Sequence, residues 1–309
     1  MKESTNKEYK SNAAHLHGFL NKVRVNPTFE DGNTAIDLRV TTYESFKKDG
    51  ENNRRYTDHD VRFITSDENK VKEYQALQKS LDDYDALRKS GKKDIERPDP
   101  HKITIDGHLV VNNYTREDGT KVYTNRIIAD EKDVLLDAKR QVIDDKKEPM
   151  NSISIAGNIA SIKMFDNFAI MSVALHYAVP KGSKGGREVN FVNADGKEVS
   201  YTEMTNYVNT RINENRHKEE FAALKNGELE VGDKIAIKGQ MHENDYSNEE
   251  KKSENYGIVI DIASLSLIRK KSEKQELETE TKVETKAETK VKAKEDKKEK
   301  KARTRGKSL

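Results

Sequence analysis

Two clusters of cationic side chains lie beside aromatic residues, and together they could hold a planar, anionic ligand. The first cluster places four cations between two rings: Phe46, Lys47, Lys48, Arg54, Arg55 and Tyr56. The second cluster follows a single ring: Tyr177, Lys181, Lys184 and Arg187. Ammonium and guanidinium groups bind phosphate oxygens, and aromatic faces stack on nucleobases. A charged hairpin loop is also a common solvated surface, so this pattern alone leaves both interpretations open.

Other candidates of the same two chemical types are spread along both halves of the chain. They are Arg39, Tyr43, His59, Arg62, Tyr114, Arg116, Lys121, Tyr123, Tyr246 and Tyr256. The tyrosines at 43, 123 and 177 lie on expected strands, where core or cross-strand packing explains them equally well. We therefore keep both roles open for these rings.

The sequence offers no constellation for catalysis or cofactor binding. The glycine-rich segment 181–187 lacks the G-x-x-x-x-G-K-[ST] order of a phosphate-binding P-loop. The eight histidines are scattered, and no cysteine is present, so we expect no metal site and no disulfide. A nucleophile elbow and a dinucleotide loop are also missing. We predict a binding protein without a cofactor rather than an enzyme.

The candidate residues must be positioned by short alternating strands. Ile36, Leu38 and Val40 alternate with polar neighbours, which is the period-2 pattern of a half-buried strand. The first half predicts strands at about 14–25, 34–43, 56–65, 102–113 and 121–129, with residues 134–136 closing the sheet. Apolar residues at steps of three and four predict a helix at about 68–90.

The second half repeats this order. The segment Leu16 to Leu20 has its counterpart at Ile153 to Ile159, and Ile103 to Leu109 has its counterpart at Lys234 to Met241. Strands are predicted near 152–164, 167–179, 187–192, 198–202, 233–242 and 256–268, with a helix somewhere in 203–226. Five strands with a helix between the third and the fourth is the order of an OB barrel. The expected fold class is therefore all-β: two tandem OB domains, each a β-barrel with an inserted helix.

Charge and composition divide the chain further. The formal charge is −1 for residues 1–149 and −3 for residues 150–269, whereas residues 270–309 carry 15 − 9 = +6. We predict a flexible N-terminus at 1–13, domains at 14–139 and 151–269, a linker at 140–150 and a disordered, basic Lys/Glu/Thr-rich tail at 270–309. No apolar N-terminal run or membrane-length stretch occurs, so we expect a cytoplasmic protein with no membrane partner.

The first domain resembles the bacterial single-stranded DNA-binding protein family from about His15 to Leu136. The resemblance is carried by Gly18, by Asp31 to Ala35 leading into a strand that ends Thr41 to Phe46, and by Ile105 to Leu109 with the loop Tyr114 to Lys121. It implies that Phe46, His59 and Tyr114 stack on bases, although the family usually has tryptophan there and this chain has none. The basic tail also departs from the acidic tail that the family uses to recruit partners.

The function that follows is coating and protection of single-stranded DNA, with little sequence preference, during replication, recombination or repair. The host would be a bacterial cell or one infected by a phage. Expected partners are single-stranded DNA, replication or recombination proteins, and a second copy of the chain. The segment Phe168 to Leu175 is apolar on both faces and needs a cover, which could be the first domain of the same chain or a second copy of the second domain. The resemblance implies the second option, a homodimer, because bacterial members of the family present four OB domains per assembly. The alternative is an OB-fold protein-interaction scaffold that does not touch DNA.

Overall fold

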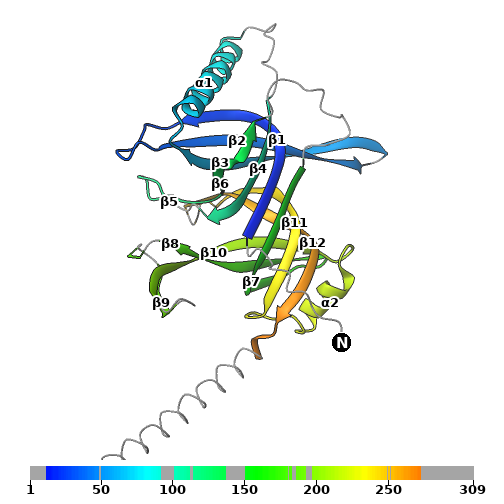
Figure 1. Cartoon of the computed structure of the whole chain (residues 1–309). Coiled ribbons are helices and arrows are strands. Elements are labelled where there is room, and N and C mark those ends of the chain that lie inside the picture. The colour runs from blue at the N-terminus through cyan, green and yellow to red at the C-terminus, as the bar shows by residue number, and fades with distance from the viewer. Residues whose placement is uncertain are drawn as a thin grey trace, which may run out of the picture.

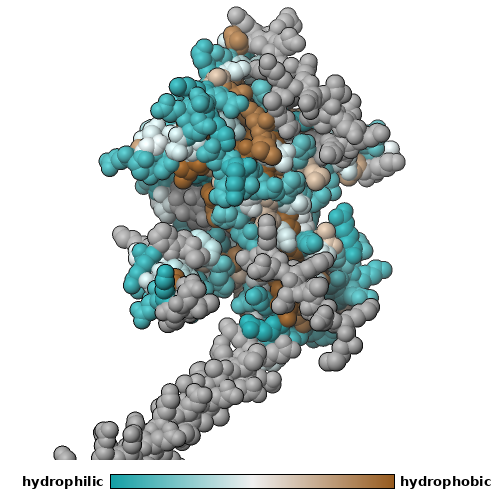
Figure 2. Space-filling view, in the orientation of Figure 1, coloured by the Kyte–Doolittle hydropathy of each residue, from teal (hydrophilic) through white to brown (hydrophobic). Residues whose placement is uncertain are grey.

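The computed structural model describes residues 12–48, 50–91, 101–111, 114–136, 150–179, 181–182, 186–192, 197–248, 250 and 252–272. Strands dominate, and they form two closed barrels, one above the other in Figure 1. The part of the surface that Figure 2 colours by hydropathy is mostly hydrophilic, and the apolar residues that it shows lie mainly along the middle of the molecule. No helix in the described part of the chain is long and apolar enough to cross a membrane.

The first barrel follows the predicted order. Its elements are β1 (Asn12–Val25), β2 (Thr34–Lys48), β3 (Glu51–Thr65), α1 (Glu68–Lys89), β4 (Lys102–Val111), β5 (Tyr114–Thr115) and β6 (Lys121–Leu136). The antiparallel order β3-β2-β1-β4-β6 closes through a parallel contact of β3 with β6, at Val61 opposite Ile127. This is a five-stranded OB barrel with its helix between the third and the fourth strand. The two segments predicted at 121–129 and 134–136 are one continuous strand.

The second barrel repeats this closure. Its elements are β7 (Met150–Met164), β8 (Phe168–Val179), β9 (Arg187–Val192), β10 (Glu198–Asn213), α2 (Lys218–Lys225), β11 (Lys234–Asn248) and β12 (Ser253–Arg269). A parallel contact of β10 with β12, at Asn209 opposite Val259, closes it. β9 adds to β10 as an extra edge strand. The prediction of two tandem OB domains is confirmed.

The strand predicted at 198–202 was wrong at its C-terminal boundary, because β10 continues to Asn213. The helix predicted somewhere in 203–226 is confirmed as α2, Lys218–Lys225. Thr202, Asn206 and Thr210 take inward-facing positions of β10 and are buried. Polar residues at these positions concealed the alternation that identifies a strand.

The repeated glycines mark the points where strands approach each other too closely for a side chain. A Cβ atom at Gly18 would lie 2.6 Å from the Thr41 carbonyl oxygen, and one at Gly157 would lie 2.3 Å from the Ala174 carbonyl oxygen. Both distances are well inside van der Waals contact. The sequence repeat therefore reflects the same sharp coiling of the first strand in each barrel.

Helix α1 covers one end of the first barrel. Asp67 caps its start by accepting a hydrogen bond from the Asn69 backbone N–H at 2.9 Å. Tyr74 is the buried residue of the helix, and its ring packs edge-on against Phe63 with 5.2 Å between centroids. Tyr74 therefore belongs to the core of the first barrel.

The two barrels are joined by shared sheet. β1 pairs antiparallel with β7, from Asn12 opposite Ile155 to His17 opposite Met150. β6 pairs parallel with β12 over four residues that begin at Lys121 opposite Ser253. Of the predicted linker at 140–150, Met150 already belongs to β7, and the rest lies outside the described residues. The barrels therefore form one continuous hydrogen-bonded structure.

Candidate nucleic-acid interface

Three aromatic rings and two cations form a row across the outer face of the first barrel. We call Phe19, Tyr43 and Tyr56, with Lys102 and Arg54, the aromatic ladder. Lys102 Nζ lies 5.6 Å from the centre of the Phe19 ring, and Phe19 stacks within 9° of parallel on Tyr43 at 6.4 Å. The Arg54 guanidinium lies 4.7 Å from the Tyr43 ring centre, and the Tyr56 ring follows at 5.9 Å.

Strand alternation and register create this row. Phe19 lies between Gly18 and the buried Leu20, so its side chain must point outward from β1. Across the sheet, Phe19 is directly opposite Lys102, and Tyr43 is directly opposite Tyr56. The ladder therefore crosses β4, β1, β2 and β3 obliquely, because Phe19 is opposite Thr41 and Tyr43 lies two residues further along β2.

The ladder offers aromatic rings on which bases can stack, with cationic groups close to those rings. Tyr56 is 57% exposed, and Phe46, further along β2, is 40% exposed. Free aromatic faces on a barrel wall can accept unpaired bases, and nearby cations can contact the phosphates between them. Sequence reasoning missed Phe19 and Lys102, although the alternation around Gly18 was a signal for the first of them.

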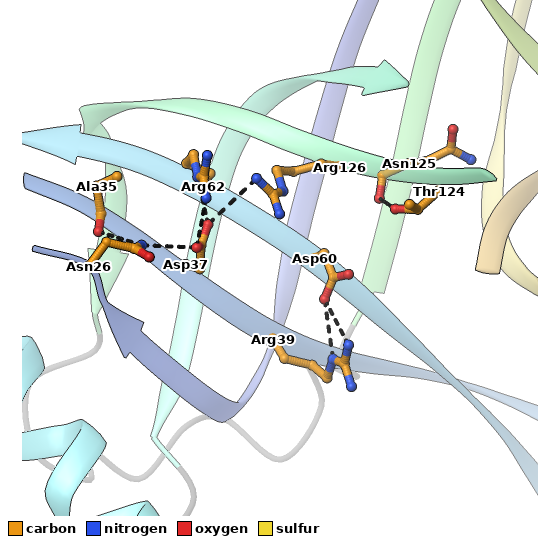
Figure 3. Close-up of polar contacts among 9 residues, drawn as sticks. All are labelled: Asn26, Ala35, Asp37, Arg39, Asp60, Arg62, Thr124, Asn125 and Arg126. Carbon is orange, nitrogen blue, oxygen red and sulfur yellow. Dashed lines mark hydrogen bonds and ion pairs between the residues drawn. The ribbon is translucent and has the colours of Figure 1, made fainter. Parts of the chain in front are cut away.

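Three predicted arginines, Arg39, Arg62 and Arg55, pair with carboxylates on the barrel surface, and Figure 3 shows the first two together with Arg126. Arg39 binds Asp60 through Nε and Nη2 at 3.2 and 3.1 Å. Arg62 binds Asp37 through two hydrogen bonds of 2.6 and 2.8 Å, and Arg126 approaches the same carboxylate at 3.7 Å.

The third, Arg55, pairs with Glu44 at 3.0 Å. Burial disfavours the charged Asp37, but hydrogen bonds from Arg62 and Asn26 and the positive charges of Arg62 and Arg126 lower its pKa. The hydrogen bond to Asp37 also raises the pKa of Arg62. The charges of Arg39, Arg55 and Arg62 are partly neutralised by these carboxylates. Arg54, which lies over the Tyr43 ring, is therefore better placed to contact a phosphate.

His59 is corrected by the structure. Its side chain is fully buried, and its Nε2 atom is 2.9 Å from the Thr42 hydroxyl. Burial, reinforced by the neighbouring His242, lowers the pKa of His59 to about 3, so the ring is neutral. A ring inside the barrel has no face for a base, and His59 leaves the candidate set.

Two other candidates lie at the junction with the second barrel. Arg116 binds Glu254 of β12 at 2.8 Å, which ties the β5–β6 loop to the second barrel. Lys121 has an exposed side chain, and its backbone N–H donates to the Lys252 carbonyl at 3.0 Å.

Lys184 lies outside the described residues. Six further candidates have a described backbone but no described side chain: Lys47, Lys48, Tyr114, Tyr123, Tyr246 and Tyr256. Tyr123 of β6 and Tyr246 of β11 are both opposite Asn255 of β12, so their backbones flank the same strand from its two sides at the junction. Their role as base platforms stays a prediction.

The candidate residues of the second barrel do not form a row of stacked rings like the aromatic ladder. Tyr177 on β8 is half-buried opposite Met204, and Lys181 is exposed. Arg187 is 76% exposed but pairs with Glu203 at 2.8 Å. The described residues contain no group of three or more His, Asp or Glu side chains arranged to hold a metal ion.

No protein-family model matches the chain, and no curated protein matches it. Among solved structures, the wild-type single-stranded DNA-binding protein of Thermus aquaticus is similar over 84% of this chain and 93% of its own, with 14% identity and a TM-score of 0.47. The small single-stranded DNA-binding protein of Streptomyces coelicolor covers 38% of this chain and 92% of its own, at 16% identity and a TM-score of 0.25. A Plasmodium falciparum SSB solved in complex with ssDNA covers 44% and 96%, at 14% identity and a TM-score of 0.26.

Proposed function

We propose that the chain binds single-stranded DNA with little sequence preference and protects it during replication, recombination or repair. The observation that carries this proposal is the aromatic ladder, whose three rings lie in a row on a solvent-facing wall, with Lys102 over Phe19 and Arg54 over Tyr43. Every base has a flat face, so stacking on such a row tolerates any sequence. We place the protein in the cytoplasm of a bacterial cell or of a phage-infected host.

The ladder favours a single strand over a duplex. In a duplex each base is already stacked and paired, so its face is not available to a ring on a protein wall. The body of the protein is close to neutral, and general attraction to polyanions therefore contributes little. Local stacking and a few phosphate contacts must supply the affinity.

A fluorescence titration with single-stranded DNA, duplex DNA and single-stranded RNA of equal length tests the proposal. We expect binding to the single strand at low salt, weaker binding to the duplex, and a steep loss of affinity as salt rises. Equal affinity for duplex and single strand would reject the proposal. Absence of binding at low salt would favour the alternative, an OB-fold scaffold that binds other proteins.

A homodimer through the second barrel is part of the same proposal. The argument for it was that the outer face of β8 needs a cover, and contacts within the chain already cover part of that face. On β8 the residues Ala169, Met171 and Val173 are buried in the core, as expected. On the other face the chain itself half-buries Ile170, and Phe168 stacks on Phe165 at 4.4 Å. Light scattering on the full chain tests the dimer, and a monomer at micromolar concentration would leave intrachain packing as the cover.

A further inference from the structure

The second barrel has a wall that corresponds, position by position, to the aromatic ladder. Phe19 follows Gly18 and lies opposite Lys102, and in the same way Asn158 follows Gly157 and lies opposite Lys234. Gly18 approaches the carbonyl of Thr41, and Gly157 approaches the carbonyl of Ala174. These equivalent contacts establish which positions correspond in the two barrels.

The alignment extends to the two other rings of the ladder. Tyr43 lies two residues beyond Thr41 and opposite Tyr56, and His176 lies two residues beyond Ala174 and opposite Thr205. The three ladder rings are therefore replaced by Asn158, His176 and Thr205, whereas the cation at the end of the row is kept.

Loss of the rings leaves a groove of about 960 Å³. We call it the barrel-two groove, and the residues that matter for its chemistry are Asn158, His176, Arg187, Tyr207, Lys234 and Arg269. His176 and Thr205 are joined by a hydrogen bond of 3.0 Å between Nδ1 and the hydroxyl. Tyr207, 59% exposed, is the aromatic ring in the lining.

The groove is cationic, and two of its charges are not neutralised. Lys234 and Arg269 are directly opposite each other on β11 and β12. Like charges in this arrangement destabilise a sheet, and neither has an ion-pair partner among the residues that the structure describes. Glu203, the carboxylate in the lining, is paired with Arg187. Such an uncompensated pair is expected where a bound anion supplies the missing charge.

Cationic side chains line both ends of the groove. The uncompensated pair, Lys234 and Arg269, lies at one end, and Arg187, which is paired with Glu203, lies at the other. Arg187 is on β9 and Lys234 is on β11, with β10, β8 and β7 between them. Four steps between neighbouring strands correspond to about 19 Å along the sheet. A small anion cannot reach both ends, whereas an extended polyanion can.

We propose that the barrel-two groove binds the phosphodiester backbone of a single strand, without stacking most of its bases. The first barrel then binds mainly through bases and the second mainly through phosphates. This inference rests on the proposed function, because it assumes that the ladder holds the same strand.

The test uses two fluorescently labelled probes of equal length: oligothymidylate and an abasic oligomer, which keeps the phosphodiester backbone but has no bases. The variant K234Q/R269Q removes both charges while keeping polar side chains of similar reach. K79Q is the matched control, since Lys79 is 81% exposed on α1, away from the groove. Y43A reports on the ladder.

For K234Q/R269Q we expect weaker binding of both probes. The slope of log affinity against log salt should fall by about 1.4, because each phosphate contact on a single strand contributes about 0.7. Y43A should weaken binding of oligothymidylate and leave binding of the abasic probe unchanged. The melting temperature of K234Q/R269Q should not fall, since the mutation removes a repulsion.

A wild-type salt slope for K234Q/R269Q on both probes would overturn the inference. If that unchanged slope is accompanied by a loss of dimer mass in light scattering, the groove is assigned instead to contact between two copies. Failure of the proposed function looks different: Y43A would then bind oligothymidylate as tightly as the wild type, whatever the groove variant does.

Discussion

The side-chain amide of Asn151, in the second barrel, donates a hydrogen bond to the hydroxyl of Thr42, in the first barrel, at 3.0 Å. Both residues are buried. The Asn151 oxygen also accepts from the Met241 backbone N–H at 2.5 Å, and the Thr42 hydroxyl contacts His59 at 2.9 Å. One amide therefore connects β2, β7 and β11 at the point where the two barrels share sheet.

Asn151→Ala should destabilise the whole protein. The change leaves the Met241 N–H without its acceptor and the Thr42 hydroxyl without one of its partners, inside a buried seam. An unsatisfied buried polar group costs about 1–3 kcal/mol of unfolding free energy. Chemical denaturation measures this loss, and Ser152→Ala, at the exposed neighbouring position on the same strand, is the control.

The same experiment examines the coupling of the barrels. If the seam joins them into one cooperative unit, the wild type unfolds in a single transition, whichever probe is used. Two well-separated transitions in the wild type would show that the seam contributes little and that the barrels fold independently.

Two buried histidines make stability depend on pH. Burial lowers the pKa of His59 to about 3 and also lowers that of His242. Asp261, 3.3 Å from His242 Nε2, and Glu44 oppose the shift of His242, whereas Arg55 and Arg211 favour it. The Nδ1 atoms of both rings lack a hydrogen-bond partner among the described residues. Burial therefore favours the neutral form of both rings in the fold.

The sign of the effect follows from these directions. Below the ordinary histidine pKa of about 6.5, the unfolded chain takes up protons that the folded chain does not. Stability is fully present above about pH 6.5 and falls as the pH is lowered, by up to about 1.4 kcal/mol per pH unit for each histidine. Denaturation between about pH 7 and pH 5, above the titration of most carboxylates, measures it.

His242→Gln should reduce this pH dependence, because glutamine does not titrate. His108→Gln is the control, since the His108 side chain is exposed on β4. If His242→Gln keeps the wild-type dependence, the buried ring is not the source of the effect.

The ladder rings should contribute to binding and not to folding. Tyr56→Ala should weaken single-strand binding by about 1–3 kcal/mol, the usual contribution of one stacked base. Ile64→Ala is the control: Ile64 is 52% exposed on the same strand, outside the ladder. A fall in melting temperature with unchanged affinity would assign Tyr56 to cross-strand packing with Tyr43.

Most of the fold was predictable because alternation and repeated glycines are local signals. The site was harder to predict. Phe19 could be placed outside the barrel by counting from Gly18, but its stacking on Tyr43 depends on the β1–β2 register, which no local pattern reveals. His59 was misplaced because the resemblance matched it to a base-stacking position on the third strand, whereas its inward position follows from the phase of β3, where Val61 and Phe63 also face the core. The seam at Asn151 joins residues more than a hundred positions apart, beyond the reach of any sequence window.

The last prediction concerns the boundary of the basic tail. The structure places Lys270 and Lys271 with the second barrel: Lys270 Nζ is 3.0 Å from Asp233 Oδ2, and the Lys271 N–H donates to Asp233 Oδ1 at 2.9 Å. Asp233 is buried, and although burial opposes its charge, the Lys271 N–H and Lys270 lower its pKa. The removable tail therefore begins at residue 273 and carries 13 − 9 = +4.

Two truncations separate the roles of these residues. Deletion of 273–309 should keep the melting temperature and reduce the salt slope of single-strand binding, because fewer phosphate contacts are lost to salt. Deletion of 270–309 should also destabilise the second barrel, by about 1–3 kcal/mol, since Asp233 keeps its buried charge without its lysine partners. Equal melting temperatures for the two truncations would mean that the contacts at Asp233 do not stabilise the fold. An unchanged salt slope after removal of 273–309 would mean that the tail does not contact DNA.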